Sequence, residues 1–254
     1  MLPLDLNCDM GESTHLHHYD VSNDLALFPF LSSINIACGA YAGDAQTMHT
    51  LVDQALRSGI AVGAHPGYAD RNNFGRTAIK LPSREIHELV LSQVKLLQDV
   101  LTDMGKRLHH VKPHGALYNS AASDPELAEA ICTAIAEAGR DILLYGLSGS
   151  CMQAAAEEQG IRFVSEVYAD RSYENDGSLT PRTVAGAILT DPAACEKQLL
   201  DMALHGSVKT STGNYISVRA ESICLHADGT RALEFAILIR KALKKHHITV
   251  TCPS

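Results

Sequence analysis

Short strand-like runs alternate with longer helical patterns along the whole of this chain. Seven apolar runs have the length and composition of buried strands, and they cover residues 4–8, 34–38, 60–64, 108–111, 142–145, 162–165 and 223–225. When a helix separates two strands, the strands pair most readily in parallel, with the helix covering the sheet. Because no composition break interrupts the repeat, we expect one α/β domain over residues 1–254.

Helix-start signals follow several of these runs. They stand at Asp44, Ser83, Asp124-Pro125, Thr180-Pro181 and Asp191-Pro192, where a capping residue or a proline suits the first turn. Further helical patterns cover residues 151–159 and 231–244. Polar loops follow nearly every strand instead of one switch point, which favours a closed or nearly closed barrel over an open sheet.

The charged residues are scattered along the chain, and the formal net charge is −8. This pattern offers no basic surface for nucleic acid or an anionic membrane. No apolar run approaches the roughly 20 residues of a membrane span, and the N-terminus lacks the pattern of a signal peptide. The seven cysteines form no Cys-x-x-Cys pair, which favours buried, reduced thiols in a cytoplasmic protein.

The densest group of reactive side chains follows the fourth strand. It consists of a lysine, an imidazole, a phenol and an amide: Lys112, His114, Tyr118 and Asn119. Parallel α/β proteins place their chemistry where strands end. A lysine that points into a barrel needs a carboxylate or an anionic ligand, because an unpaired buried charge is costly. The candidate carboxylates are Asp9, Glu12 and Glu166.

Polar side chains also follow the first and third strands. The first strand leads into Asn7, Asp9 and Glu12. Two neighbouring carboxylates can take different pKa values and divide the roles of acid and base; alternatively, one of them caps the next helix. The third strand leads into His65 and then Arg76, whose guanidinium is suited to binding an anion.

The sixth and seventh strands end in the same way. Alternation along the sixth strand places Glu166 and Tyr168 on one face. Asp170 and Arg171 follow in the loop, either as binding residues or as a solvated ion pair. The seventh strand ends at His226, beside an Asp-Gly turn.

No local pattern assigns a nucleotide or a metal site. The glycine pattern of dinucleotide sites and the phosphate loop are both missing from the sequence. Three imidazoles, those of His65, His114 and His226, follow different strands and could converge with carboxylates on Zn²⁺. Because no His-x-x-x-His pair or His/Cys spacing defines such a site locally, we assign no metal ligand.

Six ordered segments carry a family resemblance. They are DLNCDMGE at 5–12, NIACG at 35–39 with AGD at 42–44, GAHP at 63–66 with FGR at 74–76, VKPHGALYN at 111–119, EVYADR at 166–171 with DG at 176–177, and ICLH at 223–226. In this order they resemble the LamB/YcsF family, the A subunit of prokaryotic 5-oxoprolinase. The segments span nearly the whole chain, and together they are far more specific than any one alone.

The resemblance implies an irregular seven-stranded (β/α) barrel, related to the barrels of sugar and polysaccharide deacetylases. It also implies ATP-dependent hydrolytic opening of 5-oxo-L-proline to L-glutamate, performed together with partner subunits B and C. ATP is then the implied cofactor, and Mg²⁺ can accompany it.

In such a reaction a carboxylate activates water for attack on the lactam ring carbon, imidazoles carry protons, and cations stabilise developing charge. The residues expected in these catalytic roles are Asp9 or Glu12 as the base, His65 and His114 as proton carriers, and Lys112, with Arg76, as cations. The residues expected to bind substrate or phosphate are Asn7, Arg76, Tyr118, Asn119, Glu166, Asp170, Arg171 and His226.

Two positions depart from the family pattern. Tyr41 stands where the family usually has an imidazole, and Ala227 stands where its last motif has a glycine. The first change bears on proton transfer or metal binding, and the second on backbone approach beside His226. Two alternatives are a metal-dependent deacetylase on a related barrel and a substrate-binding subunit that is inert on its own.

Overall fold

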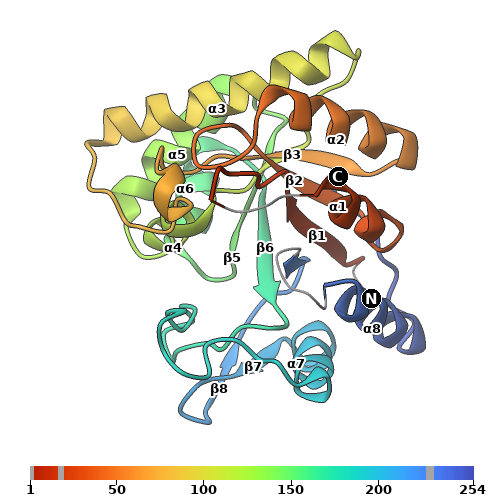
Figure 1. Cartoon of the computed structure of the whole chain (residues 1–254). Helices are drawn as coiled ribbons and strands as arrows, with labels where there is room; N and C mark the ends of the chain where they lie inside the picture. The colour runs from red at the N-terminus through yellow and green to blue at the C-terminus, as the bar shows by residue number, and fades with distance from the viewer. Residues whose placement is uncertain (1–2, 17–19, 227–231) are drawn as a thin grey trace.

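Seven parallel strands close a barrel in the computed structural model, which describes residues 3–16, 20–226 and 232–254 (Figure 1). The strands are β1 (Asp5–Met10), β2 (Ser33–Ala37), β3 (Ala61–His65), β4 (His110–Val111), β5 (Leu143–Leu147), β6 (Phe163–Tyr168) and β9 (Ser222–His226). They pair in chain order, and β9 pairs with both β6 and β1. The predicted seven-stranded barrel is therefore confirmed, with strand boundaries a few residues from those expected.

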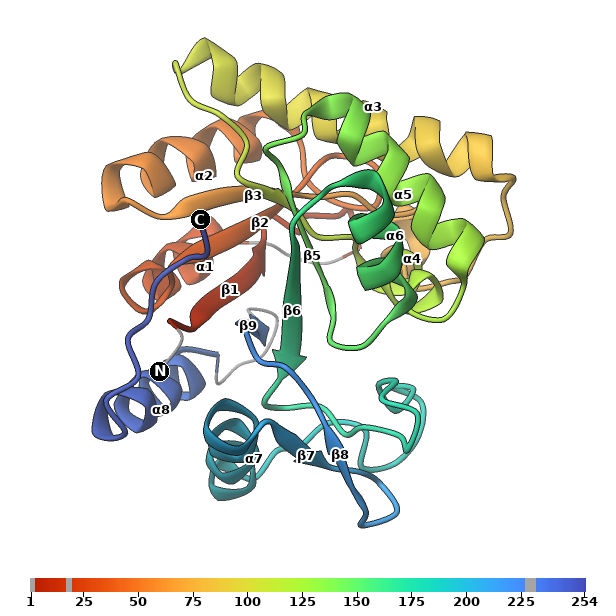
Figure 2. The same cartoon turned by 180° about the vertical axis from the view of Figure 1, so that it is seen from behind.

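The described residues form eight α-helices, most of which cover the outside of the barrel (Figure 2). They are α1 (Val21–Leu27), α2 (Ala45–Ser58), α3 (Ser83–Asp103), α4 (Gly115–Ala121), α5 (Pro125–Ala138), α6 (Cys151–Gln159), α7 (Pro192–His205) and α8 (Ala232–Lys245), with single 3₁₀ turns at Phe28–Phe30 and Arg71–Asn73. Two starts follow the predicted caps: Asp44 accepts a hydrogen bond from the backbone N–H of Thr47, and Asp124 accepts one from that of Glu126. The cap predicted at Ser83 is wrong, because Ser83 is the first residue of α3 and Pro82 stands at the N-cap.

The segment between β6 and α7 differs from the prediction. Thr180-Pro181 does not begin a helix, and Gly186 adopts a φ of +81°, which a right-handed helix does not allow. An unpredicted antiparallel hairpin follows α7, formed by β7 (Ser207–Lys209) and β8 (Tyr215–Ser217). In Figure 1, α7 and this hairpin lie beyond the end of the barrel to which β6 points.

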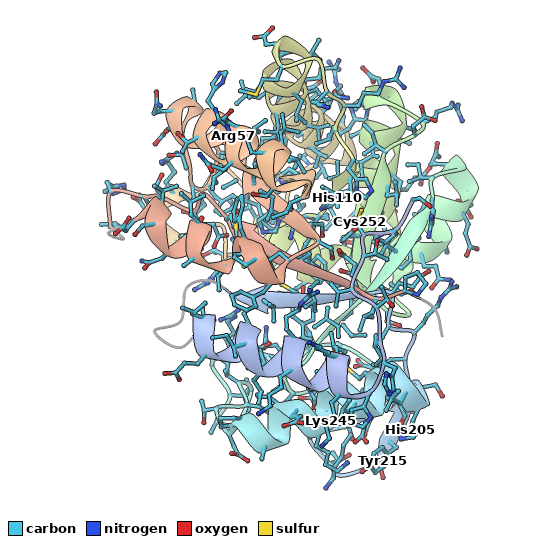
Figure 3. The ribbon with its side chains drawn as sticks, turned by 90° about the vertical axis from the view of Figure 1, so that its right-hand side faces the viewer. Arg57, His110, His205, Tyr215, Lys245 and Cys252 are labelled. Carbon is cyan, nitrogen blue, oxygen red and sulfur yellow. The ribbon has the colours of Figure 1, made fainter. Side chains whose placement is uncertain are left out.

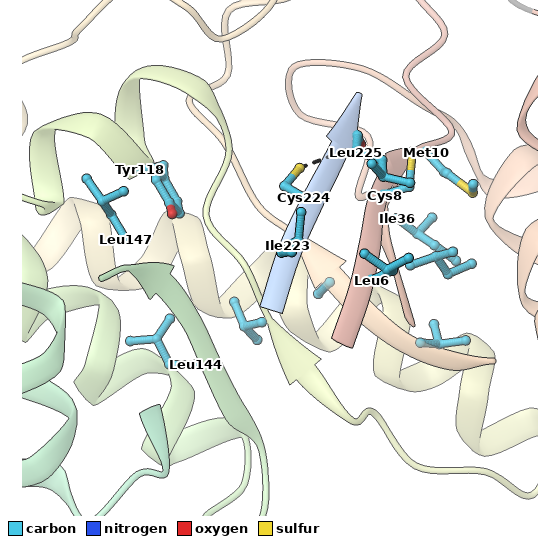
Figure 4. Close-up of a cluster of buried hydrophobic side chains, with 14 of the residues drawn as sticks. Leu6, Cys8, Met10, Ile36, Tyr118, Leu144, Leu147, Ile223, Cys224 and Leu225 are labelled. Atoms are coloured by element: carbon cyan, nitrogen blue, oxygen red, sulfur yellow. Dashed lines mark hydrogen bonds between the residues drawn. The ribbon is translucent and has the colours of Figure 1, made fainter. Parts of the chain in front are cut away.

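Polar side chains fill much of the barrel interior. In β1, Leu6 and Cys8 belong to the apolar core (Figure 4), so alternation turns Asn7 toward the barrel axis. There the Asn7 Nδ2 atom donates to Glu166 Oε1 at 2.8 Å, and Asn35 Nδ2 donates to Asn7 Oδ1 at 2.7 Å. A hydrogen-bonded network thus replaces the branched apolar side chains that usually fill such a barrel.

A buried carboxylate closes the amino-terminal end of this network. Asp5 accepts hydrogen bonds from the hydroxyls of Ser32, Ser33 and Ser222. Burial raises the pKa of Asp5, although these hydrogen bonds oppose the shift. The bonds tie β1 to β2 and β9, and they satisfy a group that would otherwise be costly to bury.

The ring of His110 packs against Gly63 inside the barrel. Figure 3 labels the side chain of His110. His110 Nε2 lies 2.7 Å from Asn35 Oδ1, and the imidazole stacks on Tyr145 with ring centroids 4.0 Å apart. A Cβ atom on Gly63 would lie 2.1 Å from His110 Nε2, well inside contact distance. Only glycine therefore leaves room for the imidazole at this point of β3.

Replacing Gly63 with Ala is expected to lower the free energy of unfolding by about 1–3 kcal/mol, because it overpacks the barrel interior. Chemical denaturation measures the change. The matched control is the same substitution in a His110→Ala background, where the added methyl group meets no ring and should cost much less. An equal loss in both backgrounds would contradict the steric explanation.

None of the described helices is long and apolar enough to cross a membrane. All seven cysteines are free, and five of them are buried, in agreement with the predicted reduced thiols.

Candidate active site

A cavity of about 520 Å³ opens where the carboxyl ends of the barrel strands meet. Nine of the predicted site residues line it: Asp9, Glu12, His65, Arg76, Lys112, His114, Tyr118, Asn119 and Arg171. This is the end of the barrel at which (β/α) barrels hold their active sites. Polar loops that stand far apart in the sequence therefore converge on one cavity, as the sequence predicts.

Lys112 is the buried cation of the cavity. Its Nζ atom lies 3.0 Å from Asp9 Oδ1 and 2.9 Å from Glu166 Oε1, so two of the three candidate carboxylates are its partners. Burial disfavours the charged ammonium, but the Asp9 and Glu166 carboxylates outweigh it and hold the pKa of Lys112 well above its usual range. The side chain is therefore a fixed positive charge at neutral pH.

Glu166 lies beneath the cavity and anchors several of its side chains. Its carboxylate is fully buried and accepts hydrogen bonds from the hydroxyls of Tyr118 and Tyr168, at 2.7 and 2.8 Å. The shared bond confirms that Glu166 and Tyr168 face the same side of the sheet. Burial, followed by the charge of Glu166, raises the pKa of both tyrosines well above the usual value, which keeps the two hydroxyls protonated as donors.

The predicted binding residue Asn7 is also fully buried below the cavity. Its Oδ1 atom accepts a hydrogen bond from Asn35 and lies 3.3 Å from Lys112 Nζ. Asn7 and Glu166 are thus placed to hold Lys112 in position, while the cavity wall itself is formed by other residues.

A compact acid–imidazole cluster lies beside Lys112. The Nε2 atom of His65 is 3.3 Å from Asp9 Oδ2 and 3.9 Å from Glu12 Oε1. The Nδ1 atom of His114 is 3.2 Å from Glu12 Oε1 and 3.0 Å from His65 Nε2. Asp9 and Glu12 do not cap the next helix, because α1 is capped by Asp20; both carboxylates face the cavity.

Burial lowers the pKa of the His114 imidazole, although its hydrogen bond to Glu12 opposes the shift. Desolvation disfavours the charged form of a buried imidazole. The cluster therefore combines carboxylates, imidazoles and a neighbouring ammonium in one partly enclosed space, a composition suited to proton transfer and to stabilising a developing negative charge.

Arg171 shapes the cavity from the loop side. Its guanidinium is buried and donates hydrogen bonds to the backbone carbonyls of Thr180 and Ala187. It is therefore no solvated surface ion pair; it holds the loop that contributes Leu179, Pro181, Arg182 and Thr183 to the cavity wall. The neighbouring Asp170 is half-buried and lies outside this wall.

The sequence matches the LamB/YcsF family over residues 4–254. The chain belongs to this family. Among the similar proteins, one from Brevibacillus brevis that is named as the A subunit of 5-oxoprolinase is 46% identical over 250 residues, which cover 98% of each chain. A protein of the same name from Bacillus cereus (strain Q1) is 42% identical over the full length of both chains.

A solved structure supports the same relationship. The lactam utilization protein from Thermus thermophilus superposes with a TM-score of 0.91 at 37% sequence identity. The match covers 99% of this chain and all of that one. The two chains therefore share the same overall fold.

Tyr41, which stands where the resemblance led us to expect an imidazole, lies inside the cluster. The side chain is fully buried, and its hydroxyl donates to Glu12 Oε1 at 2.8 Å. Its ring stacks on that of His114, with centroids 3.6 Å apart and planes 8° from parallel. The tyrosine thus orients one carboxylate and one imidazole. Burial, followed by the charge of Glu12, raises its pKa well above the usual value, so it stays protonated.

The cavity also contains residues that the sequence analysis missed. Arg182 and Thr183 lie on its rim, in the segment that was wrongly assigned to a helix. Arg182 adds a second exposed guanidinium to that of Arg76, which stacks on the ring of Phe74 at 4.8 Å. The only sequence signal was an arginine after a proline in a polar loop, a pattern too common to identify a site.

The last LamB/YcsF motif is only partly accessible. His226 ends β9, but its side chain and residues 227–231 lie outside the described residues. The predicted binding role of His226 and the effect of Ala227 stay predictions.

Proposed function

We propose that this chain is the A subunit of an ATP-dependent 5-oxoprolinase, which opens 5-oxo-L-proline to L-glutamate together with subunits B and C. The observation that carries the proposal is the full-length similarity to proteins named as the A subunit of 5-oxoprolinase, at 42–46% identity. The similar structure from Thermus thermophilus is that of a lactam utilization protein, which agrees with a lactam substrate. Because the reaction uses ATP, we place it in the cytoplasm.

The cavity suits a small anionic lactam. 5-Oxoproline carries one carboxylate and one cyclic amide, and the rim offers the guanidinium groups of Arg76 and Arg182 to the carboxylate. Deeper in the wall, the Lys112 ammonium is held by Asp9 and Glu166. A preorganised cation at this depth stabilises negative charge that develops on the amide oxygen or on a phosphate attached to it.

The proposed reaction balances with one ATP and two waters. Transfer of the γ-phosphoryl group to the lactam oxygen releases ADP, and water then adds to the ring carbon. Cleavage of the carbon–nitrogen bond, with a proton passing to nitrogen, leaves an acyl phosphate that a second water converts to glutamate and phosphate. We propose that Asp9 takes the proton from the attacking water, because its Oδ1 atom is fixed by Lys112 and Asn35 while the carboxylate faces the cavity.

The test measures glutamate and ADP formation from 5-oxoproline and ATP. We expect no turnover by this chain alone and coupled formation of both products when subunits B and C are added. Omission of this chain from the mixture is the control. Absence of glutamate in the complete mixture would contradict the proposal, and release of acetate from acetylated sugars by the chain alone would favour the deacetylase alternative.

A further inference from the structure

The two histidines of the cavity are held with their outer ring nitrogens on backbone carbonyls. His65 Nδ1 lies 2.7 Å from the carbonyl oxygen of Lys112, and His114 Nε2 lies 2.9 Å from that of Phe74. A carbonyl oxygen can only accept a hydrogen bond, so each of these nitrogens carries the hydrogen. In the neutral rings, His65 Nε2 and His114 Nδ1 then present bare lone pairs to the cavity.

These two lone pairs point toward one another and toward a carboxylate. The two nitrogens are 3.0 Å apart, and Glu12 Oε1 lies 3.2 Å from one and 3.9 Å from the other. Three acceptor atoms this close repel one another unless a proton or a metal cation lies between them. Zn²⁺ bonds of about 2.0–2.1 Å in tetrahedral geometry separate neighbouring ligand atoms by about 3.3 Å, which is within the observed range.

We propose that Glu12, His65 and His114 form a binding site for a divalent transition-metal ion. Two imidazoles and one carboxylate suit Zn²⁺ and its first-row neighbours better than Mg²⁺ or Ca²⁺. Three protein ligands leave a coordination position for water or substrate, as in catalytic zinc sites. All three side chains line the cavity, so an ion held there can polarise an amide carbonyl or a water molecule.

The surroundings of the three side chains are those of a prepared metal site. Metal-bound histidines usually donate their other ring N–H to a carbonyl or carboxylate, which fixes the ring; both rings do so here. Tyr41 fixes Glu12 with its hydroxyl and His114 with its stacked ring. Gly67 keeps this stack in place, because a Cβ atom there would lie 2.7 Å from Tyr41 Cδ1.

This site gives the histidines a role other than the proton transfer expected from the sequence. It also explains Tyr41, since a phenol that hydrogen-bonds a ligand carboxylate can orient that ligand without binding the metal itself. The proposal does not depend on the proposed function, because metal binding is measured on the chain alone, without lactam, ATP or partner subunits.

The test titrates chelator-treated protein with Zn²⁺ by calorimetry and with Co²⁺ by visible absorption. We expect one ion per chain with micromolar or tighter affinity, and cobalt bands typical of low coordination number. His65→Ala and His114→Ala should each weaken binding by about 100-fold or more, and Tyr41→Phe by about 10-fold, the range for residues that orient a ligand. His87→Ala, which removes a histidine whose Nε2 atom lies 3.3 Å from Glu137 Oε2 outside the cavity, should leave the affinity unchanged.

The alternative is that the cluster shares a proton in place of a metal. In that case wild-type protein would bind Zn²⁺ no more tightly than the His65→Ala and His114→Ala variants do, and the proposal would be overturned. Tyr41→Phe keeps the comparison valid if an alanine variant fails to fold. A loss of zinc affinity in His87→Ala equal to that in His114→Ala would overturn it as well.

Discussion

Replacing Lys112 with Met is expected to lower the free energy of unfolding by about 3–5 kcal/mol, the range for breaking a buried ion pair by removing one partner. The Lys112 side chain is 2% exposed, and its ammonium pairs with two carboxylates, of which that of Glu166 is fully buried. Methionine fills a similar volume but leaves Glu166 without its cation. The same substitution should abolish glutamate formation in the complete mixture, because the preorganised positive charge is lost from the cavity.

A second substitution separates the two effects. In the Lys112→Met, Glu166→Gln double variant, no buried charge is left unpaired at Glu166, so part of the lost stability should return while turnover stays absent. Chemical denaturation and the coupled assay measure both quantities. The control is Lys95→Met, which removes a half-exposed lysine 3.5 Å from Glu137 and should change stability by at most about 1 kcal/mol. A loss no larger in Lys112→Met than in this control would contradict the argument.

The barrel could be predicted because its determinants are local. Each strand is a short apolar run, and helix starts such as Asp44 and Asp124 carry their caps in the neighbouring sequence. The prediction that the barrel closes needed one more observation, namely that polar loops follow nearly every strand. Pairing of β9 with both β6 and β1 agrees with that prediction.

The errors in the predicted secondary structure lie where local sequence signals conflict. Thr180-Pro181 looks like a helix start, but Gly186 lies in the left-handed region and Arg171 binds the carbonyls of the loop. Arg171 is distant enough in sequence that a local pattern could not anticipate this. The short helix α4 was missed because it begins at Gly115, a residue that disfavours helices.

The positions of the site residues could be predicted, but their partners could not. Alternation and strand order brought Asp9, Lys112 and His114 to one mouth. The carboxylates that pair with Lys112, and the side chain that orients Glu12, depend on the diameter of the barrel and the stagger of its strands. Tyr41 illustrates this: its sequence position suggested a lost imidazole, whereas the structure shows a hydroxyl directed at Glu12.

Replacing Asp9 with Asn is expected to lower kcat by about 10²–10⁴-fold, the usual contribution of a general base. Asparagine keeps an oxygen that can accept from Lys112 and Asn35, as Asp9 Oδ1 does, but it cannot take a proton from water. Lys112 also keeps Glu166 as a partner, so the variant should fold. Zn²⁺ affinity should change far less than in His114→Ala, because Asp9 is not one of the three proposed ligands.

The assay compares steady-state turnover of wild type and Asp9→Asn with subunits B and C, alongside zinc affinity of the chain alone. Asp53→Asn is the matched control, since that carboxylate pairs with Arg57 on the surface of α2 and should leave both quantities unchanged. Full turnover in Asp9→Asn would contradict the assignment of Asp9 as the base. Equal loss of turnover and of zinc would instead make Asp9 a fourth ligand, which its 3.3 Å distance from His65 Nε2 allows. Turnover and zinc affinity of Asp9→Asn, measured together, therefore distinguish a general base from a metal ligand at this position.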